Sequence, residues 1–193
     1  MQLENTIDTT QPLPGDFAIW IFIFAELVVF GVLFVAYAFT RSAHVDLFNT
    51  SQLLLNRSYG FANTLVLVTS SYFVVRATQS IKAGRNTACG HWLIGALGLG
   101  TVFLALKLLE FHQDFSRGIT LSTNLFYMFY LSLTFFHFLH VIMGMVILAV
   151  VTFKAYTGRY SAANHIGVET GASYWHMVDL VWIVLFALIY VIH

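Results

Sequence analysis

The chain has 193 residues, of which 59% are hydrophobic and only 9% are charged. Soluble domains carry about 25% charged residues, so this composition excludes an ordinary soluble globular protein. Nine Lys and Arg residues balance nine Asp and Glu residues, which leaves no basic field for a nucleic-acid partner. The single cysteine, Cys89, cannot form an internal disulfide. The composition therefore indicates an integral membrane protein.

Five apolar segments follow one another along the chain, and each is close to the length of about 20 residues that a helix needs to cross a bilayer. The alternation typical of membrane strands is absent. We therefore predict an all-α fold, an integral membrane bundle of five transmembrane helices, with the segment 40–58 among its loops. A tail at 1–16 precedes a single five-helix membrane domain at 17–193, whose spans lie at about 17–39, 59–81, 91–111, 124–153 and 172–192.

The basic residues predict the orientation of this bundle. Five crossings place the two termini on opposite faces of the membrane. The face that holds the N-terminus has more basic loop residues than the other, which favours an N-inside, C-outside topology. The first face carries Arg76, Lys82, Arg85, Lys154 and Arg159, and the second carries Arg41, Arg57 and Arg117.

Polar side chains at membrane depth are the most informative residues. A charged group at the centre of a spanning helix costs roughly 2.5–3.5 kcal/mol on insertion scales, so it persists only when it is paired, faces other protein or serves a function. We expect the polar side chains within the predicted spans to point into the bundle or a subunit interface. These residues are Glu26, Glu110, His137, His140, His176 and Asp179, together with Lys107 beside Glu110.

These residues allow two functional interpretations besides simple interhelical hydrogen bonding. Glu26, Glu110 and Asp179 suit a stand-alone proton or ion carrier, although no internal Pro interrupts a span and five spans do not divide into equal halves. The His pairs suit a membrane haem or metal protein, with His140 and His176 as candidate axial ligands. The di-iron bundle pattern requires Glu-x-x-His, which does not occur here. We assign no catalytic, cofactor-binding or metal-ligating residue.

Several motifs resemble the cytochrome c oxidase subunit III family. The segment NHIGVETGASYWHMVDLVWIVLFALIYVIH (164–193) looks like its C-terminal signature, and FHFLHVIMG (136–144) is similar to its GxHGLHVxxG segment, with Phe138 in place of a Gly. LALKLLEFHQDFSRGI places Glu110 at the glutamate of the family's LxxxEYxE segment. Glu26 matches an acid in the corresponding helix, and the second span matches an NTxxLLxSS run. The long form of the family has seven helices, whereas this chain resembles the short five-helix form.

The resemblance implies a non-catalytic membrane subunit of a bacterial respiratory haem-copper oxidoreductase complex. Such a subunit stabilises the catalytic, haem-containing subunit and supports aerobic or denitrifying electron transport. The five-helix form is closest to the subunit-III-like protein associated with nitric oxide reductase, which makes an accessory role in that enzyme the alternative. The resemblance implies no cofactor in this chain, with haem and copper or non-haem iron in the partner subunit. It also implies contact with membrane lipids, including bound phospholipid, and a location in the bacterial inner membrane.

Overall fold

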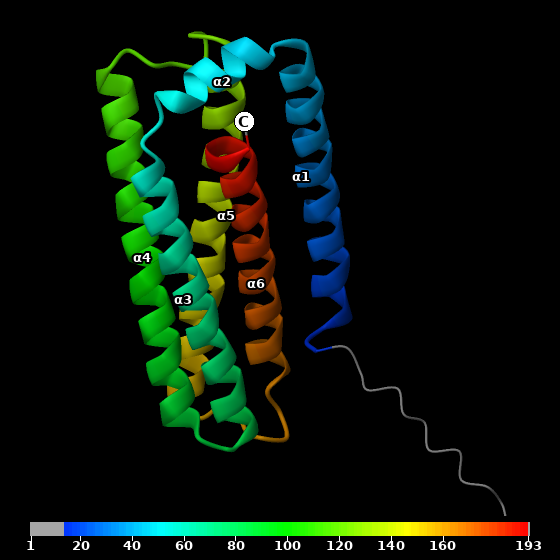
Figure 1. Ribbon diagram of the computed structural model, residues 1–193. Coiled ribbons are helices and arrows are strands. Elements are labelled where there is room, and N and C mark those ends of the chain that lie inside the picture. Colours follow the sequence, from blue (N-terminus) through cyan, green and yellow to red (C-terminus); the bar gives the residue numbers. More distant parts are fainter. Residues whose placement is uncertain (1–13, 193) are drawn as a thin grey trace, which may run out of the picture.

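The computed structural model describes residues 14–192, which form helices and no strand (Figure 1). Of the predicted tail at 1–16, residues 1–13 lie outside the described part. The last helix continues into a π-helical turn, η1 (Ala187–Val191). The α-helices in chain order are α1 (Phe17–Ala43), α2 (Val45–Leu53), α3 (Arg57–Lys82), α4 (Asn86–Ser116), α5 (Leu125–Tyr156) and α6 (Ile166–Phe186).

Local residue chemistry explains where these helices begin and end. The Asp16 side chain accepts a hydrogen bond from the Ala18 backbone N–H and caps α1, and Asn124 caps α5 in the same way. Helices α4 and α5 end just before Gly118 and Gly158, whose φ angles of 77° and 69° favour glycine. These signals, at the start of α1, at the end of α4 and at both ends of α5, lie outside the apolar segments.

The five long helices run side by side, and α2 lies across one end of the bundle (Figure 1). The described chain starts at the far end and finishes, after η1, near α2. The prediction of a loop over 40–58 was wrong for the residues of α2. That helix is short and polar, and its own residues Phe48 and Gln52 are buried, so its stability comes from packing rather than from an apolar run.

Four helices in the described residues are long and apolar enough to cross a membrane: α1, α4, α5, and α6 with its continuation to Val191. This makes the chain a multi-pass membrane protein. Helix α3 has 26 residues, but its many Ser, Thr, Asn and Gln side chains lower its apolar character. The structure thus identifies four candidate spans, and composition alone does not assign α3 to the bilayer.

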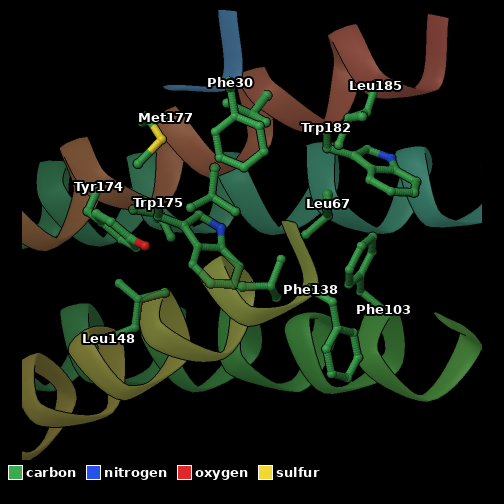
Figure 2. Packing of buried hydrophobic residues seen from close by; sticks show 14 of the residues in the cluster. Phe30, Leu67, Phe103, Phe138, Leu148, Tyr174, Trp175, Met177, Trp182 and Leu185 are labelled. Atoms are coloured by element: carbon green, nitrogen blue, oxygen red, sulfur yellow. The ribbon is translucent and has the colours of Figure 1, made fainter. Parts of the chain in front are cut away.

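The core of the bundle lies between α3, α4, α5 and α6, with α6 packed beside α3 and α5. Figure 2 shows Trp175 and Trp182 of α6 pointing into this space, and both side chains are fully buried. Close packing around Trp175 depends on two glycines. A Cβ built on Gly144 of α5 would lie 2.9 Å from the Trp175 ring, and one on Gly100 of α4 would lie 3.1 Å from it. Small residues are what membrane helices use to approach closely.

Helix α1 stands at the edge of the bundle (Figure 1). Of the most apolar 18-residue stretch of α1, only 11% is buried within the chain, whereas the value is 56% for α6 with its continuation to Val191. Its attachment is therefore limited to a few positions. At its start, the Gly15 backbone N–H donates to Glu169 of α6, and near its end the Tyr37 hydroxyl donates to the Leu188 carbonyl.

The π-helical turn η1 has a visible cause in the hydrogen bonds that it makes. Gln52 of α2 donates to the carbonyls of Leu188 and Ile189, each at 3.1 Å, and Tyr37 of α1 also bonds to Leu188. Side chains from two other helices thus take carbonyls that a regular α-helix would use internally. This contact joins α1, α2 and the C-terminal end of the described chain.

Candidate functional site

Glu26 and His140 form a polar contact between α1 and α5. Glu26 Oε2 lies 3.0 Å from His140 Nε2, and His140 Nδ1 lies 2.7 Å from the carbonyl of Phe136 on its own helix. Both side chains are half-buried. The ring of Phe30 packs edge-on against the imidazole, with the centroids 5.1 Å apart. The contact therefore holds α1 to the bundle at a point that is otherwise lined by apolar side chains.

His137 does not share the environment of His140, although the two are three residues apart. The sequence predicts that they face the same way. Instead, the fully buried His137 turns toward α6, where its Nε2 lies 3.0 Å from the Val178 carbonyl. Its ring packs against Trp182 and Phe103. Side chains three residues apart on an α-helix point in directions that differ by about 60° around its axis, so these two histidines contact different neighbouring helices.

The most charged contact is centred on Lys107 of α4, whose side chain is 0% exposed. Lys107 Nζ lies 2.9 Å from Glu110 Oε2 and 3.2 Å from the Tyr190 hydroxyl, which donates to Glu110 Oε1 at 2.6 Å. The Tyr130 hydroxyl lies 3.0 Å from Glu110 Oε1 and 2.9 Å from Asp114 Oδ2, so its single proton serves one carboxyl at a time. The ammonium also lies over the rings of Phe111, Tyr130, Trp182 and Tyr190.

His176 and Asp179 of α6 lie against α3. His176 Nδ1 is 2.6 Å from the Ser71 hydroxyl. Asp179 is 5% exposed, and neither of its carboxyl oxygens makes a hydrogen bond. The two residues thus differ: the imidazole forms a hydrogen bond with the neighbouring helix, and the carboxyl forms none.

A pocket of about 230 Å³ opens near His176, between the end of α3 and the start of α6. Its polar lining includes Lys82 and Glu169, whose side chains form an ion pair at 2.8 Å. Thr78, Gln79 and Ser173 complete the polar part of the wall. The side chain of His176 therefore lines a cavity at the end of the bundle where α1 begins.

The six polar residues predicted from the sequence therefore lie in separate contacts rather than in one site. Within the described residues, no three His, Cys, Asp or Glu side chains gather closely enough to hold a metal ion. Sequence reasoning missed the partners Ser71, Tyr130 and Tyr190. It also missed Asn63 of α3, which is fully buried without a hydrogen-bond partner for its side chain. Asn63 and Ser71 belong to the NTxxLLxSS resemblance of the second span, which gave them no contact, and only their polar character within apolar runs marks Tyr130 and Tyr190.

The family described as Cytochrome c oxidase subunit III matches residues 9–193 of the chain. Cytochrome c oxidase subunit 3 of Synechocystis is 33% identical over 177 residues, which cover 91% of this chain and 75% of that protein. The subunit 3 of Thermostichus vulcanus is 32% identical over 182 residues, covering 89% and 84%.

A relative of different organisation is the heme-copper oxidase subunit I+III of Aeropyrum pernix. It is 28% identical over 190 residues, which cover 94% of this chain but only 23% of that protein. The family match covers all the helices described above and all six of the polar residues predicted from the sequence. The chain belongs to the cytochrome c oxidase subunit III family.

Proposed function

We propose that the chain is the non-catalytic third subunit of a bacterial haem-copper oxidase, bound in the membrane beside the catalytic subunit. The observation that carries this proposal is the match to the Aeropyrum pernix protein, whose name joins subunits I and III. Nearly all of this chain matches less than a quarter of that protein. A relative that carries both subunits in one polypeptide supports a stable association between them.

The proposed role is to stabilise the catalytic subunit and support its turnover. In this proposal, the partner subunit holds the haem and copper, which supply electron transfer and oxygen chemistry. The polar residues of this chain hold its own helices together through contacts such as Glu26 with His140. Its outward faces, rich in exposed apolar side chains such as Val28 and Val32, suit contact with lipid and with another membrane subunit. Bound phospholipid is part of this proposal.

The reported relatives favour an oxygen-reducing complex. Each of them is named as a subunit of a cytochrome c oxidase or a heme-copper oxidase. The alternative of an accessory subunit of nitric oxide reductase, with a role in denitrification, has no support from these relatives. We therefore retain the oxidase as the proposed partner.

We further propose that α3 also crosses the bilayer, which gives five spans. Helix α3 lies alongside α4 and α6 (Figure 1). Some of its polar side chains find partners inside the bundle: Ser70 donates to the Ala96 carbonyl, and Thr64 accepts from Trp182. Such internal pairing lowers the cost of placing polar groups in lipid. The excess of basic residues at the end where α1 begins favours an N-inside, C-outside orientation in the bacterial inner membrane.

Copurification tests the proposal. The chain carries an affinity tag, membranes are solubilised in a mild detergent, and the eluted proteins are identified and scanned for haem absorbance. We expect a haem-containing catalytic subunit in an amount comparable to that of the chain. A tagged, unrelated multi-pass protein expressed at the same level serves as the control. Elution of the chain without any haem protein, from membranes with active oxidase, would contradict the proposal.

A further inference from the structure

Asp179 is a buried carboxyl that nothing in the described chain neutralises. Both of its oxygens are enclosed, and neither makes a hydrogen bond. An ionised carboxylate in such a place costs far more than a neutral acid, because no donor or cation replaces the lost water. The contrast with Glu110 is direct, since Lys107 and two tyrosine hydroxyls surround that carboxyl. The surroundings of Asp179 therefore favour its protonated, neutral form.

Several charged and titratable groups on α3, α4 and α5 have other partners. On α5, His137 bonds to the Val178 carbonyl, and His140 is paired with Glu26 of α1. On α3, the Arg76 guanidinium lies over the Trp92 ring, and Lys82 is paired with Glu169. On α4, Lys107 is paired with Glu110. None of these groups forms a hydrogen bond or ion pair with Asp179.

Ser71 is the polar side chain that Asp179 faces across the α3–α6 interface. Its hydroxyl is engaged with His176 at 2.6 Å rather than with the carboxyl. His176 in turn lines the pocket that also holds Lys82 and Glu169. An acid, a hydroxyl and an imidazole thus follow one another from the middle of the bundle to a pocket at its end, whose lining includes the Lys82–Glu169 ion pair.

We propose that Asp179, Ser71 and His176 form a proton-exchange route, in which Asp179 stores a proton that it exchanges with water in the pocket. In the stored state, the Asp179 acid proton points to the Ser71 oxygen, and the Ser71 hydroxyl donates to Nδ1 of neutral His176. A side-chain motion of Asp179 closes the distance to Ser71.

Release of the proton moves one hydrogen along each link. The Asp179 proton passes to the Ser71 oxygen as the Ser71 proton passes to His176 Nδ1, which leaves a carboxylate and an imidazolium. The imidazolium then loses its Nε2 proton to pocket water and is neutral again. Uptake reverses these steps, so one proton is exchanged and no oxidant or reductant takes part. After one release and one uptake, His176 and Ser71 carry the same protons as before.

Infrared spectroscopy of the intact purified complex tests the stored proton. A protonated carboxyl has a C=O band that shifts when its hydrogen is exchanged for deuterium. We expect one such band to disappear in Asp179→Asn and to move to a new position in Asp179→Glu, which keeps the acid if the amide variant does not assemble. A wild-type spectrum in which neither substitution alters a protonated-carboxyl band would overturn the proposal.

The exchange rate tests the route. After transfer to D₂O, the Asp179 band should shift at least about tenfold more slowly in Ser71→Ala and in His176→Phe than in the wild type. Ser70→Ala is the matched control, because it removes a hydroxyl of the same size at the next position, where Ser70 bonds to Ala96 of α4. Exchange in Ser71→Ala at the rate of Ser70→Ala would overturn the route.

Discussion

Glu26 of α1 and His140 of α5 lie 3.0 Å apart, and their contact joins the least buried spanning helix to the bundle. Hydrogen bonds between membrane helices average about 0.6 kcal/mol, with some near 1.7. We expect a coupling energy of about 1 kcal/mol between the two side chains in a double-mutant cycle with Glu26→Ala and His140→Ala. Thermal unfolding of the purified protein in detergent supplies the measurement. Strictly additive losses in the double variant would show that the pair does not hold α1.

Gly144 lies where α5 packs closely against Trp175 of α6. A Cβ at Gly144 would meet the Trp175 ring at 2.9 Å, and this ring is fully buried. Gly144→Ala should therefore lower the free energy of unfolding by about 1–3 kcal/mol, the usual cost of overpacking. Gly98→Ala is the control, since a Cβ there meets nothing within 4 Å. Equal thermal stability of the two variants would contradict this packing argument.

Lys107 is buried with its partner Glu110, so the loss of one charge leaves the other uncompensated. Lys107→Met should destabilise the protein by about 3–5 kcal/mol, as breaking a buried ion pair does. The double variant Lys107→Met with Glu110→Gln should recover part of that loss, because Gln still accepts hydrogen bonds from Tyr130 and Tyr190. Lys154→Met, near the end of α5, is the control. Yields and melting temperatures of the folded protein distinguish these outcomes, and a double variant worse than Lys107→Met would contradict the account.

The topology makes a prediction that a reporter can check. The reporter is an enzyme that is active only in the periplasm. With five crossings and the N-terminus inside, this reporter should be active when it is fused after His193. A reporter placed in the segment joining α3 and α4, after Gly84, should behave as cytoplasmic. The second fusion tests α3 separately, because the composition of this helix does not establish that it crosses the membrane. Periplasmic activity after Gly84 would overturn the crossing by α3.

The helical, membrane-embedded nature of the chain was accessible from its sequence because apolar runs of about 20 residues have few other uses. The helices nevertheless extend past these runs. Helix α4 starts at Asn86 rather than near residue 91 and ends at Ser116 rather than near 111. Hydropathy marks the part of a helix that suits lipid, whereas caps and glycines fix its ends. Helix α2 was missed because it is short and polar.

The partners of the polar residues were less accessible. The spacing of Lys107 and Glu110 at three residues predicts a contact within one helix, and they do pair. The same spacing predicts that His137 and His140 face the same way, and this prediction was wrong, because His137 contacts α6 and His140 contacts α1. Pairings such as Ser71 with His176 join residues that are 105 positions apart. They depend on how the helices are rotated and aligned in space, which periodicity along one segment does not determine.

Native mass spectrometry of the complex released from membranes tests the central claim most directly. The account predicts an assembly that contains this chain and a catalytic subunit, and gentle activation should then release this chain without haem while the haem mass stays with the partner. Haem retained on the released chain would contradict the account, as would a chain that leaves the membrane only by itself.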